Sequence, residues 1–202
     1  MKYSLIRPCA WLFMAICLFF SLPACATRTP TDKRPEAAVK GETKVLVAYM
    51  TWSGHLRTLA EWVADETKGE LFRILTVNPY PESYTEAIMR SKEELNNNTL
   101  PELATHIPPE IMAKYNTIYI GFPIWWYDVP MPVRTFAKEY DFAGKKIIPF
   151  FSHQGTSDGG QSAQTLKAIF PKSEVVSDML SIRGTKAKDS EAAVRAWVKK
   201  QK

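Results

Sequence analysis

Residues 51–55 read Thr-Trp-Ser-Gly-His and place two hydroxyl groups, a glycine and an imidazole in one short segment. An apolar run, 45–50, precedes them, and apolar residues recur at helical spacing from Leu56 to Thr67. The segment therefore lies where a buried strand passes into a helix. The first amides of a helix have no intrahelical acceptor, and the helix dipole favours an anion there by about 0.3–2 kcal/mol. These features predict a phosphate site, although the same residues would also suit a simple helix cap.

A second segment, residues 122–128, reads Phe-Pro-Ile-Trp-Trp-Tyr-Asp and brings large aromatic side chains together. A flat conjugated ring could stack against them. Tryptophan pairs also occur in hydrophobic cores, which is the alternative interpretation. Because adjacent indoles cannot easily point into one core, we expect one of the two to face a crevice, with Trp52 as a further candidate.

A third segment, residues 152–158, is polar and reads Ser-His-Gln-Gly-Thr-Ser-Asp. His153 could hydrogen-bond the edge of a ligand, or it could be a satisfied loop histidine. His55 could donate to a phosphate when protonated, or it could be a surface histidine at a helix start. The remaining histidine, His106, has no evident partner. Because the three histidines have no paired carboxylates at ligand spacing, we expect no metal site.

The elements that must position these segments alternate along the chain. Apolar runs predict strands at 45–50, 71–77, 117–121, 146–151 and 174–182, and helical spacing predicts helices at 56–67, 83–95, 133–140, up to about 170, and at the C-terminus. Such alternation predicts an α/β fold with a parallel sheet covered by helices on both faces. Ligands bind at the carboxyl ends of the strands, where all three segments would meet. Pro149 inside the fourth predicted strand would remove a ladder donor unless it lies near the strand's end.

These segments, in this order, resemble those of the flavodoxin family, and the first resembles its variants that read Tyr-Phe-Ser-Trp-Ser-Gly-Asn-Thr. The resemblance covers nearly all of the chain after residue 43, and it implies a flavodoxin-like three-layer sandwich with a five-stranded parallel sheet of order 2-1-3-4-5. It also implies FMN as cofactor, with electron transfer through N5 of the isoalloxazine. The residues that it places at the cofactor are Thr51, Trp52, Ser53, Gly54, His55, Leu56, Pro123, Ile124, Trp125, Trp126, Tyr127, Ser152, His153, Gln154, Gly155 and Thr156.

The chain departs from the family in two places. His55-Leu56 replaces Asn-Thr, so one hydroxyl donor is lost. Tyr127-Asp128 stands where a glycine often follows the tryptophan pair, and that glycine eases a peptide flip beside the flavin. If Asp128 were ionised and close to the ring, we would expect it to lower the flavin potential.

The N-terminus reads as a targeting segment. Lys2 and Arg7 precede an apolar stretch of about 14 residues, which is shorter than the roughly 20 that a membrane-spanning helix needs. The tetrad Leu22-Pro23-Ala24-Cys25 resembles the lipobox of bacterial lipoproteins, which implies that residues 1–24 are removed and that Cys25 carries the lipid. An ordinary signal peptide cut near residue 24 or 26 is the alternative. We therefore expect an exported lipoprotein, anchored in the membrane and facing the periplasm or the cell surface.

The rest of the chain reads as a tether followed by a domain. Residues 25–43 would be the lipidated cysteine and a flexible tether, and 44–202 the folded domain. Without residues 1–24, the chain has 24 basic and 21 acidic side chains, a formal net charge of +3, and no motif for nucleic acid. A group of acidic side chains indicates a solvated helix face or a surface for a basic partner: Glu82, Glu86, Glu93 and Glu94.

Three functions remain open from the sequence. The first is an FMN protein that transfers electrons to an unknown redox partner, or reduces a small acceptor, at a membrane surface. The second is an NAD(P)H-dependent quinone or flavin reductase, in which a nicotinamide would stack on the flavin. The third is a flavodoxin-like binding or scaffold protein without a cofactor.

Overall fold

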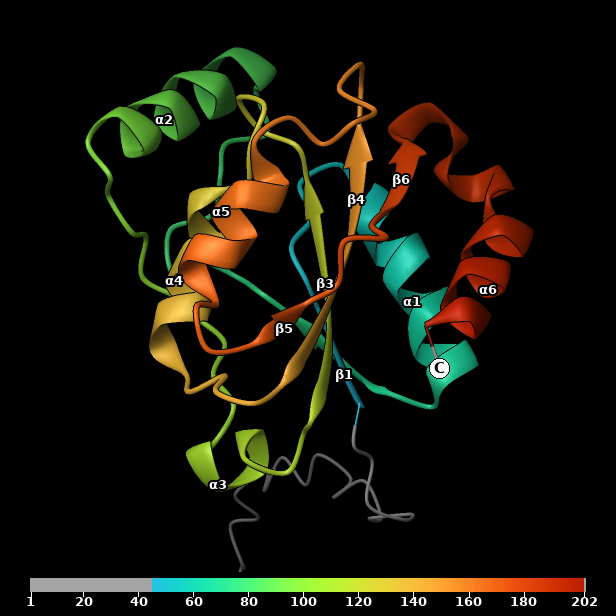
Figure 1. The fold of residues 1–202 in the computed structure, drawn as a ribbon. Helices are drawn as coiled ribbons and strands as arrows, with labels where there is room; N and C mark the ends of the chain where they lie inside the picture. The colour runs from blue at the N-terminus through green and yellow to red at the C-terminus, as the bar shows by residue number, and fades with distance from the viewer. Residues whose placement is uncertain (1–44, 202) are drawn as a thin grey trace, which may run out of the picture. The chain divides into compact units, whose positions relative to one another are not determined.

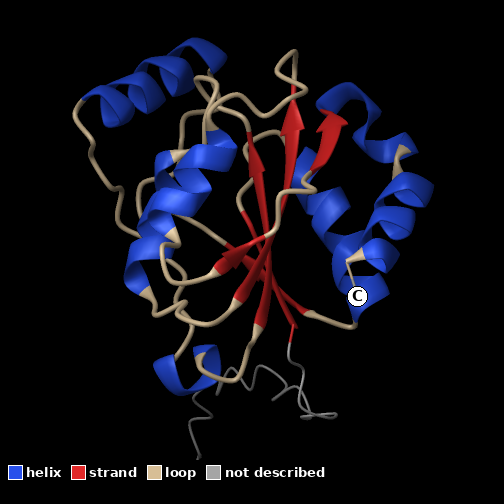
Figure 2. Ribbon diagram, viewed as in Figure 1, coloured by secondary structure: helices blue, strands red, loops and turns tan. Residues whose placement is uncertain are grey.

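The structure is a computed structural model that describes residues 45–201 (Figure 1). The expected signal peptide at 1–24, the expected lipidation site Cys25 and the expected tether to residue 43 lie outside the described residues. The described chain forms an α/β domain in three layers, with helices on both faces of a central sheet (Figure 2).

The sheet is parallel and has the order β2-β1-β3-β4-β5, which confirms the predicted topology. A sixth strand, β6, also pairs with β4. The strands are β1 (Val45–Tyr49), β2 (Glu70–Arg73), β3 (Thr117–Pro123), β4 (Lys146–His153), β5 (Glu174–Val175) and β6 (Leu180–Arg183).

One face of the sheet is covered by α1 (His55–Thr67) and α6 (Glu191–Lys200), and the other by α4 (Met131–Glu139) and α5 (Ser162–Ile169) (Figures 1 and 2). The helix α2 (Tyr84–Asn96) lies instead at the carboxyl end of the strands. Alternate residues of β1 show the layering, because Val47 and Tyr49 join the core beneath α1 while Leu46 and Ala48 join the opposite core. The central strands are therefore apolar on both faces.

The predicted fifth strand at 174–182 is split in two. β5 pairs with Lys146 and Ile147, whereas β6 pairs with the last four residues of β4. The carbonyl of Ile147 accepts the Val176 amide at 2.9 Å, so it faces this edge, and Pro149, two residues on, faces the same edge. Pro149 thus lies where β5 has ended and β6 has not begun, and its missing N–H removes no bond to β3.

Two other predicted boundaries were wrong. The strand expected at 71–77 ends at Arg73, because the chain then leaves β1 and Thr76 forms an antiparallel bridge with Leu103. Between residues 95 and 117, where no element was predicted, the chain contains a short helix, α3 (Pro109–Met112), with proline at its first position. A 3₁₀ helix, Gly184–Asp189, follows β6. Within residues 45–201, none of the helices is long and apolar enough to cross a membrane.

Gly121 of β3 makes room for an aromatic ring of the neighbouring strand. It pairs with Phe150 of β4, and a Cβ atom at Gly121 would overlap the Phe150 ring, which is fully buried. The two strands carry the second and third candidate loops, so this contact packs together the elements that position those loops.

We expect Gly121→Ala to lower the free energy of unfolding by about 1–3 kcal/mol, because the added methyl overpacks the core. Urea denaturation would measure the change. Gly155→Ala is the control, since an added Cβ there has no neighbour within 4 Å, and it should shift the free energy by less than about 0.5 kcal/mol. Equal effects of the two substitutions would contradict the packing argument.

A histidine–carboxylate pair joins the segment before α3 to the end of α4. His106 Nδ1 hydrogen-bonds Glu139, and this bond raises the pKa of His106 above its ordinary value. Because the folded-state pKa is raised, the pair stabilises the fold below about pH 6.5, and the contribution is lost as the pH rises through the raised pKa.

We expect His106→Gln to destabilise the protein at pH 5.5 and to leave its stability unchanged at pH 8.5, as measured by urea denaturation. In a Glu139→Gln background the same substitution should have no pH-dependent effect. A destabilisation of equal size at both pH values would show that the ion pair is not its cause.

Candidate functional site

The first candidate loop turns sharply into α1. Gly54 caps the helix with a φ of 89°, in the left-handed region, and an added Cβ there would meet open space. Its amide donates to Thr51 Oγ1 at 3.0 Å. Ser53 is exposed, whereas Leu56 is buried in the core beneath α1, so only backbone atoms of Leu56 could face a ligand. The loop therefore offers an exposed hydroxyl at a helix N-terminus.

His55 is held between the first and third loops. Its Nδ1 lies 3.0 Å from Ser53 Oγ. A Cβ atom added at Gly184 would lie 2.5 Å from His55 Nδ1 and 2.9 Å from Gln154 Nε2. Gly184, which follows β6, thus leaves space for the side chains of His55 and Gln154. No feature of the sequence predicted that Gly184 lies at the site.

The second loop contains an unusual two-residue turn. Trp125 and Asp128 exchange backbone hydrogen bonds of 3.1 and 3.0 Å, and between them Trp126 and Tyr127 have φ values of 52° and 60°. Hairpin turns of this kind usually use glycine or asparagine, and each non-glycine residue with positive φ costs about 1 kcal/mol or more. Tyr127 thus occupies a conformation that glycine would adopt without strain.

This turn is fixed by the segment before α5. The Tyr127 carbonyl accepts the Gln161 amide at 2.8 Å, and Gly160, with a φ of 58°, packs against the same carbonyl where a Cβ atom would overlap it. The peptide that follows Tyr127 is therefore bonded to the residue before α5. Rotation of this peptide would break that hydrogen bond.

Asp128 anchors the second loop to the helices that follow it, and its carboxylate is paired with other side chains. It is buried, with Oδ2 2.7 Å from Arg134 and 2.8 Å from Thr165, and Oδ1 accepts the Val129 amide at 2.7 Å. The Arg134 guanidinium pairs with this carboxylate, so any effect of the Asp128 charge on a flavin potential would be offset by the positive charge beside it.

The two indoles of the second loop separate as expected. Trp125 packs against the core beneath α4 and makes an edge-on contact with Tyr80, with ring centroids 4.8 Å apart. Trp126 is 36% exposed and donates its indole N–H to Ser91 of α2 at 3.1 Å. Trp52 is also exposed and donates to the Pro81 carbonyl at 2.9 Å.

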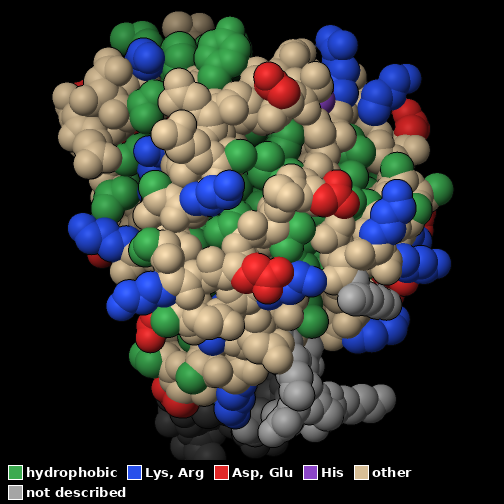
Figure 3. All heavy atoms as spheres, in the orientation of Figure 1, with side chains coloured by type: hydrophobic (Ala, Val, Ile, Leu, Met, Phe, Trp, Pro, Cys, Tyr) green, Lys and Arg blue, Asp and Glu red, His purple; other side chains and the backbone are tan. Residues whose placement is uncertain are grey.

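The first and second loops share a cavity of about 180 Å³. Trp52, Ile124, Trp125 and Trp126 line it from the loops, and Tyr84 and Ser91 line it from α2. The contribution of α2 could not be expected from the sequence, because its residues carry no motif. Hydrophobic side chains gather on the surface over α2 (Figure 3).

One acidic residue of α2, Glu94, helps to hold the aromatic side chains beside this cavity. Glu94, expected on a solvated face, is buried; it accepts the Tyr80 hydroxyl and is 2.9 Å from Arg90. Burial, followed by the bond to Glu94, raises the pKa of Tyr80. The network holds Tyr80 against Trp125.

The third loop leaves one buried polar atom without a partner. His153 Nδ1 is buried and has no hydrogen-bond partner among the described residues, as is also true of Ser162 Oγ. Burial, together with the charge of Arg183, lowers the pKa of His153 below its ordinary value and so favours the neutral ring. Ser152 is buried and its carbonyl accepts the Ile124 amide at 2.8 Å, while Gln154 and Gly155 are exposed and Thr156 is partly buried.

The three candidate loops therefore meet at one edge of the sheet. The first and second share a cavity, the first and third meet around Gly184, and a backbone hydrogen bond from Ile124 to Ser152 joins the second and third. Among residues 45–201, histidines, cysteines and carboxylates form no group that could hold a metal ion.

Solved structures with this fold include flavoproteins. A Bacteroides uniformis protein assigned to the flavoproteins is 30% identical over 77% of this chain and 97% of its own, with a TM-score of 0.64. A similar protein from Bacteroides eggerthii is 29% identical over 77% and 96%, with a TM-score of 0.66. A Lactobacillus acidophilus flavoprotein, crystallised with FMN, is 18% identical over 73% and 97%, with a TM-score of 0.57, and shares the fold.

The sequence profile of the flavodoxin family matches residues 44–201, which is nearly the whole chain after the expected tether. This match agrees with the observed sheet order and with the three loops at its carboxyl edge. The chain therefore belongs to the flavodoxin family.

Proposed function

We propose that this protein binds FMN at the three loops and acts as a redox protein beside a membrane. The observation that carries the proposal is the meeting of a helix N-terminus, an aromatic loop and a polar loop at the carboxyl edge of one parallel sheet. Family membership supports it, as does the FMN complex of the related fold from Lactobacillus acidophilus.

The described residues fit FMN. A phosphate needs donors at a helix N-terminus, and the exposed Ser53 hydroxyl supplies one, while Gly54 leaves open space through which a phosphate can approach. A flavin edge carries hydrogen-bonding groups, and the unpartnered His153 Nδ1 is a buried polar atom that such a group could satisfy. Exposed indoles, Trp52 and Trp126, are available for ring contact.

When bound, FMN supplies electron transfer through its isoalloxazine ring. The residues of the chain bind it, orient it and limit access of water. Trp126 is held by Ser91 and the Tyr127 carbonyl by Gln161, so the aromatic loop presents a fixed shape. His153 adds a hydrogen-bonding group, and its lowered pKa favours the form that carries no charge.

We expect Ser53→Ala to weaken FMN binding by about 10-fold or more, because a hydrogen bond to a charged group contributes about 1.5–3 kcal/mol. Riboflavin, which lacks the phosphate, should bind both proteins alike. Quenching of flavin fluorescence on titration with the full chain would measure both affinities. Thr99→Ala, which removes an exposed hydroxyl outside the three loops, is the control.

Equal losses for FMN and riboflavin would mean that Ser53 supports the loop and does not hold the phosphate. Absence of saturable flavin binding to the unaltered chain would refute the cofactor and favour a binding or scaffold role.

The membrane location rests on the sequence of the N-terminus, where a lipobox-like tetrad ends at Cys25. Acylation there would keep a tethered redox domain next to membrane-bound electron carriers. Only Cys25 of the three cysteines would remain after cleavage, and acylation accounts for an unpaired cysteine in an exported chain.

We expect the full chain, expressed in a bacterium fed with labelled palmitate, to carry the label and to fractionate with membranes. Cys25→Ser should abolish the label, whereas Cys17→Ser, within the expected signal peptide, should retain it. A labelled Cys25→Ser protein, or an unlabelled native chain, would contradict the lipoprotein assignment.

A further inference from the structure

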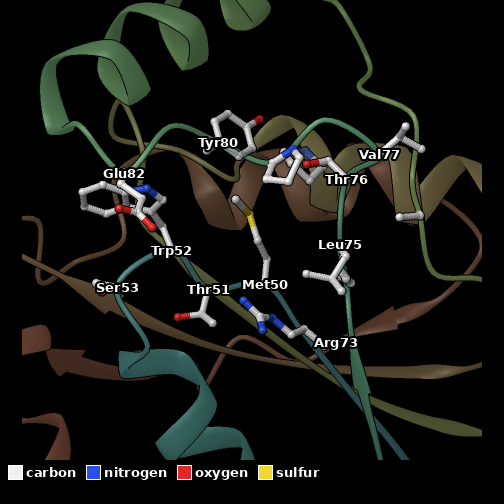
Figure 4. A pocket seen from close by; sticks show the side chains of 14 residues that line it. Met50, Thr51, Trp52, Ser53, Arg73, Leu75, Thr76, Val77, Tyr80 and Glu82 are labelled. Carbon is white, nitrogen blue, oxygen red and sulfur yellow. The ribbon is translucent and has the colours of Figure 1, made fainter.

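A second, larger cavity lies beside the first loop, on the side of β2 (Figure 4). Its volume is about 540 Å³, within the range of small-molecule sites. Thr51, Trp52 and Ser53 form one wall, and the segment after β2 forms the opposite wall. No residue of the second or third loop lines it.

The walls of this cavity are held by specific bonds. The Ala104 amide donates to the Leu75 carbonyl at 2.7 Å, and the Val77 amide donates to the Glu102 backbone carbonyl at 2.9 Å. The Thr105 hydroxyl donates to the Arg73 carbonyl at 2.8 Å, and the Leu75 amide donates to Thr105 Oγ1 at 3.2 Å. The cavity is thus part of the folded architecture and does not depend on a loosely held loop.

The lining is largely apolar and open. Leu75 and Val77 are 37% and 48% exposed although their backbones are bonded into the wall. Met50, Tyr80 and Pro132 complete the apolar surface. Ordered walls that leave apolar side chains accessible are typical of ligand sites.

Two charged side chains line this cavity, Glu82 beside Trp52 and Arg73 at the end of β2 (Figure 4). Arg73, the last residue of β2, extends its guanidinium toward Thr51 (Figure 4). Among the described residues, no carboxylate forms an ion pair with this guanidinium and no side-chain hydrogen bond satisfies it. A guanidinium binds carboxylates and similar planar anions through paired hydrogen bonds.

We propose that this cavity is a second small-molecule site that binds an aromatic or aliphatic carboxylate, with the apolar body against Leu75, Val77 and Tyr80 and the anionic group at Arg73. Trp52 lines this cavity and also the smaller one at the aromatic loop. The site goes beyond the proposed FMN function, since it needs neither the aromatic loop nor a bound flavin.

The test is a fluorescence titration of the full, flavin-free chain with the anionic probe 1-anilinonaphthalene-8-sulfonate, followed by displacement with 2-naphthoate or with the neutral 2-naphthylmethanol. We expect one saturable site and displacement by 2-naphthoate at a concentration at least 5-fold lower than by the alcohol. In Arg73→Ala the two displacers should become equal.

Two further variants make the result specific. Ala104→Trp fills the cavity from an exposed position and should weaken the probe at least 10-fold. Arg57→Ala removes the same charge from a nearby residue that is paired with Glu61 and does not line the cavity, and it should bind the probe as the native chain does.

Probe binding that is unchanged in Arg73→Ala and Ala104→Trp, or no saturable binding at all, would overturn the proposal. Because the titration contains no flavin, its failure is distinguishable from failure of FMN binding, which is measured separately.

Discussion

The buried carboxylate of Asp128 fixes the site to the fold. It joins its own loop to α4 through Arg134 and to α5 through Thr165, and it accepts the amide of Val129 where the chain turns toward α4. With Asp128 held there, and Trp125 bonded to it across the turn, the two residues between them adopt positive φ values. Within the turn that this anchor holds, the Gln161 amide fixes the Tyr127 carbonyl, and Ser91 accepts the indole N–H of the exposed Trp126.

The parallel sheet determines which loops meet. Because β1, β3 and β4 are neighbours and run in one direction, their carboxyl ends lie at one edge, and each loop can be held by the next. The glycines at these contacts allow close approach. Gly160 accommodates the Tyr127 carbonyl, and Gly184 accommodates His55 and Gln154. The first and second loops line one part of the smaller cavity, and Ser91 and Tyr84 of α2 line another part.

Much of this arrangement could be predicted from the sequence. Unbroken apolar runs specified the central strands, and the position of polar and aromatic segments after them specified the edge where they meet. The division of the last predicted strand into β5 and β6 could not be predicted, because an apolar pattern does not show which residues of a neighbouring strand it pairs with. The burial of Asp128 and Glu94 was also missed, since each depends on a basic or hydroxyl partner brought there by tertiary structure. The cavity at Arg73 arises from segments about 30 residues apart and has no local signature.

The interruption opposite Pro149 has a consequence for self-association. The outer side of β4 is covered by two short strands, of two and four residues, that do not form one continuous border. The opposite border, β2, has four residues. In the part of the chain that the structure describes, neither margin of the sheet offers a long row of unpaired amides and carbonyls onto which a strand of another molecule could add. Short borders of this kind are one way in which a sheet avoids edge-to-edge association with other molecules.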